Sequence, residues 1–164
     1  MPEFLLPESE WPAMPDSHRA FLASALSACR ESPMLCGLAA GGSFIANRLD
    51  RYSDLDLLVV VAGSTAALPR SAREQVASRM GPLLAAFTGE HVNEPRLVIC
   101  LYGPPLLHVD LKFLPAAQLN PRVEDPTVLW DRDGEVRHAL ASGTAAYPVP
   151  DLQWIEDRFW VWAH

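Results

Sequence analysis

The segment Leu38–Val61, LAAGGSFIANRLDRYSDLDLLVVV, decides the fold, because it joins a Gly-Gly-Ser turn to an apolar run that opens with two aspartates. Alternate residues of a strand share a face, so Asp54 and Asp56 are predicted to lie about 6.5–7 Å apart on one face. The run Leu57–Val61 is apolar on both faces, which is typical of a central strand. An Asx turn would explain one aspartate but not two on one face. Buried carboxylates are costly unless a cation or hydrogen bonds compensate them, and this spacing would let both reach a shared divalent metal ion or a close pair of ions.

The Gly41-Gly42-Ser43 turn follows a short apolar segment, Met34–Ala40, which we predict to be a strand. Glycines let the backbone approach a phosphate closely, consecutive N–H groups can cradle it, and the Ser43 hydroxyl can add a donor. An ordinary strand-to-helix turn would have the same sequence. We expect a short helix over Phe44–Leu49, whose N-terminus would favour an anionic phosphate.

A second group of polar residues lies on a predicted strand at Leu106–Leu114, whose sequence alternates with period two. One face carries His108, Asp110 and Lys112, and the other is apolar. Alone, the trio would indicate the solvated face of an edge strand. We expect His108 to be a hydrogen-bonded sheet histidine.

These motifs resemble the signature of the DNA polymerase β-like nucleotidyltransferase superfamily, which is a Gly-Ser turn, about ten residues, and then Asp-apolar-Asp/Glu-apolar. Gly42-Ser43 and Asp54–Leu57 match it in this order. The chain is most similar to small bacterial members, which include aminoglycoside and lincosamide nucleotidyltransferases and the minimal nucleotidyltransferases of toxin–antitoxin pairs. Specific motifs cover roughly residues 35–114, and the remainder matches only in general layout.

The resemblance implies an α+β fold, with a mixed, mostly antiparallel sheet and helices packed mainly on one face. It implies transfer of a nucleoside monophosphate, AMP from ATP being the expected case, to a hydroxyl of a small-molecule acceptor with two Mg²⁺ ions. Asp54, Asp56 and Asp110 would be the catalytic and metal-binding residues. The nucleotide would be bound by Gly42, Ser43, Ser53 and Lys112.

The sequence departs from the family pattern just after the turn. Many relatives carry Ala-Arg-Gly after Gly-Ser-x, where this chain has Ile45, Ala46 and Asn47. Asn tolerates a left-handed backbone, so the turn can persist. The missing arginine removes a phosphate contact or an ion pair, which leaves open a domain that binds nucleotide without catalysis.

Composition limits the class of protein. The chain has 164 residues, which suits one domain, and a formal net charge of −7, which argues against a broad nucleic-acid-binding surface. No apolar run approaches the roughly 18 residues of a membrane helix, and the N-terminus lacks signal-peptide features. Cys29, Cys36 and Cys100 lack metal-ligand spacing, so we predict reduced packing residues in a cytoplasmic protein.

The other predicted elements follow from apolar periodicity and turn residues. A first helix over 16–30, capped by Asp16 or Ser17, has one apolar stripe. We further expect a helix over 70–87 that is kinked at Pro82, followed by strands over 96–102 and 127–130. A short helix over 135–142 and a last helix over 151–162, capped by Asp151, complete the prediction.

The last helix carries three tryptophans and a phenylalanine on more than one side. We therefore expect residues 1–150 to form the nucleotidyltransferase domain and residues 151–164 to begin a C-terminal helix or helical domain. That segment would pack in a homodimer or against a helical partner. Two readings remain open beside an antibiotic-modifying enzyme: an antitoxin-type protein that acts on or binds a helical partner, and a nucleotide-binding domain without catalysis.

Overall fold

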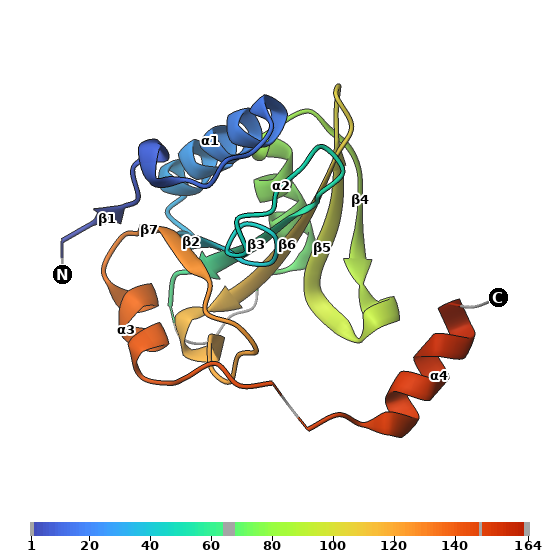
Figure 1. Ribbon diagram of the computed structural model, residues 1–164. Coiled ribbons are helices and arrows are strands. Elements are labelled where there is room, and N and C mark those ends of the chain that lie inside the picture. Colours follow the sequence, from blue (N-terminus) through green and yellow to red (C-terminus); the bar gives the residue numbers. More distant parts are fainter. Residues whose placement is uncertain (1, 64–67, 148, 163–164) are drawn as a thin grey trace.

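The computed structural model describes residues 2–63, 68–147 and 149–162. They form an α+β protein with one seven-stranded sheet and four α-helices (Figure 1). The strand order is β1-β7-β2-β3-β6-β5-β4. The strands are β1 Phe4–Leu5, β2 Leu35–Ala40, β3 Leu55–Val61, β4 Leu83–Gly89, β5 Glu94–Tyr102, β6 Leu107–Pro115 and β7 Thr127–Asp131. The helices are α1 Asp16–Glu31, α2 Arg70–Met80, α3 Glu135–Ala141 and α4 Leu152–Trp162, with 3-10 turns η1 Glu8–Glu10, η2 Glu90–Val92 and η3 Ala116–Gln118.

The sheet is mixed and mostly antiparallel, as predicted. Among the strand pairs of the described residues, β3 with β6 is parallel and the others are antiparallel. Strand β3 is fourth of the seven, which confirms its predicted central place. The parallel pair and its register bring the start of β3 beside the start of β6, where the predicted site residues lie.

The main core lies between one face of the sheet and helices α1 and α2. Alternate residues of β3 and β6 point into it, including Leu57 and Leu111. The predicted apolar stripe of α1 packs against them, with Leu22 and Cys29 fully buried. Tyr102 crosses this core and donates a hydrogen bond from its hydroxyl to the Ala77 carbonyl at 2.9 Å. This packing fixes which residues of β3 and β6 face the opposite side.

The opposite face has a smaller core at one end only. There Val136 of α3 packs with Val60, Leu114 and Leu119. The buried carboxylate of Asp131 holds the start of α3, because its Oδ1 accepts from the Gly134 N–H at 2.8 Å and its Oδ2 from the Arg137 backbone N–H at 3.1 Å. The rest of this face is left for the polar residues of β3 and β6.

One predicted helix is wrong in its last part and another is wrong as a whole. Residues 83–87 form strand β4 rather than the end of a helix, because Gly81-Pro82 stops α2 and the chain then pairs with β5. The predicted helix over Phe44–Leu49 is a series of turns instead. Its backbone bonds are irregular, and Asn47 has φ 51°, a left-handed conformation that ends a helix.

The capping of α1 is also different from the prediction. Asp16 and Ser17 lie inside the helix, Pro15 precedes it, and no side chain caps it. The last helix agrees, because the Asp151 carboxylate accepts from the Trp154 N–H at 3.0 Å. Figure 1 shows α4 standing apart from the sheet. The side chains of Leu152 and Ile155 on this helix are exposed.

The three cysteines are free and buried, which confirms that they are packing residues. Within the described ranges, no helix is long and apolar enough to cross a membrane.

Candidate functional site

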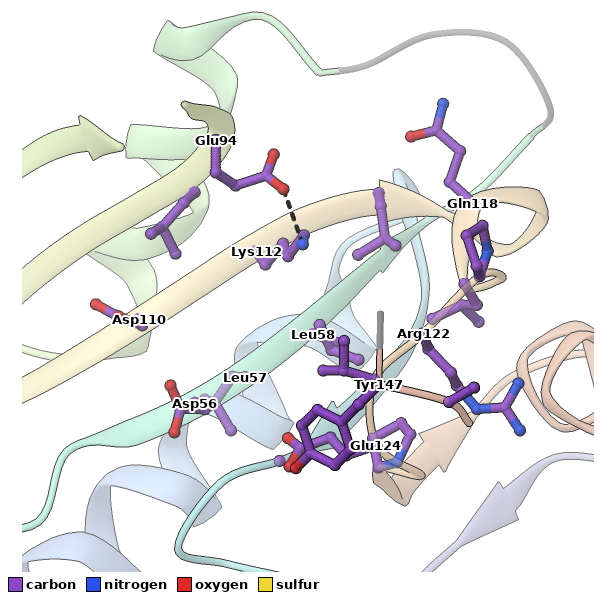
Figure 2. A pocket seen from close by; sticks show the side chains of 18 residues that line it. Asp56, Leu57, Leu58, Glu94, Asp110, Lys112, Gln118, Arg122, Glu124 and Tyr147 are labelled. Atoms are coloured by element: carbon purple, nitrogen blue, oxygen red, sulfur yellow. Dashed lines mark ion pairs between the residues drawn. The ribbon is translucent and has the colours of Figure 1, made fainter. Parts of the chain in front are cut away.

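The site is built around two aspartates that face each other across the parallel strands. Asp56 of β3 and Asp110 of β6 are register partners, and both are half-buried on the face away from α1 and α2. Figure 2 shows their carboxylates beside each other at one end of a pocket. The pairing depends on register, because a shift of one residue would turn one of the two carboxylates toward the core.

Asp54 immediately precedes β3 and belongs to a group with His108 and Asp110. His108 Nε2 lies 2.9 Å from Asp110 Oδ1, and His108 Nδ1 lies 3.9 Å from Asp54 Oδ2. One ligand atom from each of the three residues lies within 4.8 Å of the others, so the group could hold a metal ion. Asp56 is not one of these three residues, so the group that could hold one ion contains two of the three predicted aspartates together with His108.

The glycine turn packs directly against the carboxylates. Gly41 donates from its N–H to the Asp56 carbonyl at 2.9 Å. Gly42 has φ 54°, and a Cβ built on it would lie 2.0 Å from Asp56 Oδ2. Both the left-handed backbone and the space therefore require glycine at position 42.

A fourth carboxylate reaches the same turn from the segment after η3. Glu124 Oε1 accepts from the Gly42 N–H at 2.9 Å, and a Cβ on Gly41 would lie 2.5 Å from the same oxygen. Arg122 anchors the segment that carries Glu124 by donating to the Gly143 carbonyl at 2.8 Å. The Gly42 N–H, which the sequence assigns to a phosphate, thus binds a carboxylate of the chain itself.

Burial, followed by the charges of neighbouring carboxylates, raises the pKa of two aspartates in this site. Desolvation is the largest cause for Asp56, followed by the charges of Asp54, Asp110 and Glu124, and together they raise its pKa to about 6. Desolvation also raises the pKa of Asp110, and the neighbouring His108 partly offsets this rise. The fold therefore concentrates negative charge at this place, which a bound cation would relieve.

Lys112 lies two residues beyond Asp110 on the same face, but its ammonium is directed away from the aspartates. Its Nζ forms an ion pair with Glu94 Oε2 at 2.8 Å, drawn as a dashed line in Figure 2. Hydrogen bonds from Arg96, together with Lys112, lower the pKa of Glu94 to about 2. Glu94 therefore stays ionised and holds both cations.

Ser53 shapes the backbone before Asp54. Its N–H and Oγ lie 2.9 and 3.1 Å from Asp50 Oδ1, in an Asx turn, and its carbonyl accepts from His18 Nε2 at 2.8 Å. The predicted nucleotide-binding residues are thus divided. Gly42 lies at the carboxylates, Ser43 follows in the same turn, Lys112 lies further along β6, and the Ser53 hydroxyl is engaged in the turn.

A pocket of about 800 Å³ extends from the carboxylates along the open face of the sheet (Figure 2). Its volume is in the usual range of small-molecule sites. Figure 2 shows Asp56 and Asp110 at one end of the pocket, and Gln118 and Arg122 at the other. Glu124 also lines the pocket, and most of the lining surface is apolar. The apolar lining includes Leu58, Leu97, Leu114, Leu119, Pro121, Val123 and Pro126.

Sequence reasoning missed Glu94, Glu124 and His18. Glu124 lies in an irregular segment, 82 residues from Gly42, and no motif marks it. His18 lies on the predicted first helix, 35 residues before the Ser53 carbonyl that it binds. Glu94 extends β5 two residues before its predicted start, and this extension brings it to Lys112. Strand parity would not have indicated this contact, because Leu97 is the register partner of Lys112 and Glu94 lies an odd number of residues before it.

Comparison with known proteins does not assign this chain to a family. No protein-family model matches the sequence, and a search of curated proteins gave no significant match. The class is therefore defined by fold and site alone: an α+β protein with one mixed seven-stranded sheet and an Asp/His/Asp group that could hold a metal ion.

Proposed function

We propose that this protein is a nucleotidyltransferase, which transfers a nucleoside monophosphate from a nucleoside triphosphate, with ATP as the expected donor, to a hydroxyl of a small-molecule acceptor. The observation that carries the proposal is the contact of the Gly41-Gly42 turn with Asp56, opposite Asp110. A phosphate-cradling turn and a cation-binding carboxylate pair are the two parts that this chemistry needs.

The donor set fits a divalent cation, because Asp54, Asp56 and Asp110 offer carboxylate oxygens, which Mg²⁺ prefers. When bound, two such ions supply charge neutralisation to the triphosphate and to the departing pyrophosphate. Asp54, Asp56 and Asp110 would hold them. The acceptor oxygen attacks the α-phosphorus, and the bond from that phosphorus to the pyrophosphate oxygen breaks.

The chain's own groups have further roles in this proposal. The N–H groups of the turn at Gly42 and Ser43 would bind phosphate oxygens in place of the Glu124 carboxylate. Asp110, whose pKa is raised, would accept the proton of the acceptor hydroxyl. The apolar lining of the pocket, which includes Leu97 and Leu119, would hold the body of the acceptor.

The test is release of pyrophosphate from each nucleoside triphosphate with Mg²⁺, in the presence of a panel of aminoglycosides and lincosamides, followed by mass spectrometry of the acceptor. The expected product is an acceptor heavier by one nucleoside monophosphate. Asp56→Asn and Asp110→Asn should abolish it, whereas Asp157→Asn, on α4, serves as the matched control. Equal transfer by the parent and both site variants would refute the assignment.

A second candidate function is binding of a helical partner, as in the antitoxin-type proteins that the sequence resembles. What favours it is the exposure of Leu152 and Ile155 on α4. Light scattering of the parent and of Ile155→Glu tests it. A parent that is monomeric and binds no helical peptide would exclude this candidate.

A further inference from the structure

We propose that Asp54, His108 and Asp110 form a site for a divalent transition-metal ion of the Mn²⁺-to-Zn²⁺ class, which they bind in preference to Mg²⁺. The role of the ion in this proposal rests on the proposed function, whereas the binding of the ion does not. It adds His108 to the carboxylates that the sequence predicts and assigns Asp56 to a different position in the site.

The chemistry of the donors points to this class of metal. Mg²⁺ and Ca²⁺ take oxygen ligands almost exclusively. Imidazole nitrogen suits Zn²⁺ and the other first-row transition ions, and carboxylates suit Mn²⁺. A site with one histidine and two aspartates therefore discriminates against Mg²⁺ through the nitrogen donor of His108.

The distances between the donors are compatible with one ion. Metal–ligand bonds of about 2.1 Å place neighbouring ligands of an octahedral ion about 3 Å apart and opposite ligands about 4.2 Å apart. His108 Nε2 and Asp110 Oδ1 lie 2.9 Å apart in a hydrogen bond, which a bound ion would replace, and one ligand atom from each of the three residues lies within 4.8 Å of the others. The side chains of Asp54 and His108 are each 43% exposed, so small rotations can close the remaining gap.

The charge around the group gives an independent reason for a cation. Among the ion pairs formed by the described residues, none joins Asp54, Asp56, Asp110 or Glu124 to an arginine or a lysine. Lys112 is the cation on the same strand face, and Glu94 binds it at 2.8 Å. The carboxylates of these four residues thus lie close together, and His108 contacts two of them, Asp54 and Asp110. A bound metal ion would supply the positive charge that the site lacks.

The experiment measures metal binding by calorimetry on the tag-free parent and on His108→Gln, which exchanges a nitrogen donor for an amide oxygen. Co²⁺ is the probe, Mg²⁺ is the comparison, and the pH is about one unit above the usual histidine pKa of about 6.5. The matched control is His138→Gln, which removes an exposed imidazole from α3. Circular dichroism verifies that each variant is folded.

We expect the parent to bind Co²⁺ at least tenfold more tightly than Mg²⁺, with visible absorption bands characteristic of nitrogen ligation. His108→Gln should weaken Co²⁺ binding at least tenfold and change Mg²⁺ binding less than twofold, and His138→Gln should match the parent. Equal affinity for the two metals in the parent, no Co²⁺ binding, or unchanged Co²⁺ binding in His108→Gln would overturn the proposal.

The outcome is separable from that of the proposed function. If Co²⁺ binds through His108 and no nucleotide is transferred, the metal site stands and the nucleotidyltransferase assignment fails. If transfer depends on Asp56 and Asp110 while His108→Gln binds Co²⁺ like the parent, the nucleotidyltransferase assignment stands and the proposed metal site fails.

Discussion

Asp56 and Asp110 are register partners across the parallel pair of an otherwise antiparallel sheet, and both carboxylates lie on its open face. They come from segments 54 residues apart and meet beside the turn at Gly42. Desolvation and mutual repulsion make this arrangement costly in the absence of a cation. A bound cation would relieve this cost.

The first prediction concerns the opposite effects of removing one of these charges. Asp56→Asn should lower the rate of nucleotidyl transfer at least about 100-fold, because it removes a metal-binding carboxylate. The same change should stabilise the metal-free protein, since it relieves repulsion from Asp54, Asp110 and Glu124. Urea unfolding with a chelator, beside steady-state kinetics, measures both. A variant that is less stable than the parent and fully active would contradict the prediction.

The second prediction concerns the dependence of stability on pH. The folded pKa of Asp56, about 6, is above its ordinary value of 3.8, so the folded state binds more protons between these values. Stability should therefore fall as pH rises from about 4 through 6, by on the order of 1–2 kcal/mol from this group after allowance for solvent screening of a half-buried carboxylate. The raised pKa of Asp110 acts in the same direction.

Urea titrations of metal-free protein at several pH values measure this slope. Asp56→Asn should flatten it, and saturating divalent metal should flatten it in the parent, because the bound ion stabilises the charged form. A metal-free parent whose stability rises across this interval would show that other groups dominate.

The third prediction concerns the carboxylate at the glycine turn. Glu124→Gln keeps an oxygen that can accept from the Gly42 N–H but removes the negative charge beside Asp56. Binding of ATP with Mg²⁺ should tighten about fivefold, equivalent to ~1 kcal/mol, since the phosphate no longer displaces a charged group. Glu10→Gln, on η1, is the control. Weaker ATP binding in Glu124→Gln would instead make Glu124 a ligand of the bound state.

The fourth prediction concerns the need for glycine at position 42. Gly42→Ala should destabilise the protein by about 3 kcal/mol or more, because a positive φ is strained for alanine and its Cβ meets Asp56 Oδ2. Gly63→Ala is a matched control, since Gly63 has φ 90° with nothing within 4 Å of a built Cβ. That variant should cost only the backbone strain, about 1 kcal/mol.

Thermal or urea unfolding of the two variants gives the difference that isolates the clash at Asp56. Equal destabilisation of Gly42→Ala and Gly63→Ala would contradict the prediction, because it would show that the Asp56 side chain moves away from the new methyl group at no energetic cost.

Local sequence determined the strands that carry the site. The alternation in Leu106–Leu114 and the apolar run after Asp56 predicted which residues face the core, because side chains of a strand alternate and apolar ones are buried. Local sequence failed at β4, where strand pairing with β5 outweighed helical periodicity after Pro82. It failed again at Phe44–Leu49, where a left-handed Asn47 interrupts the helix.

The sequence by itself thus determined the faces of β3 and β6, the glycine turn and the aspartates that the turn accompanies. Only the tertiary structure decided which atoms meet: Asp110 opposite Asp56, His108 between Asp54 and Asp110, Glu124 on Gly42 and Glu94 on Lys112. The reason is physical. Periodicity is a property of neighbours along the chain, whereas register and long-range ion pairs depend on segments that only folding brings together.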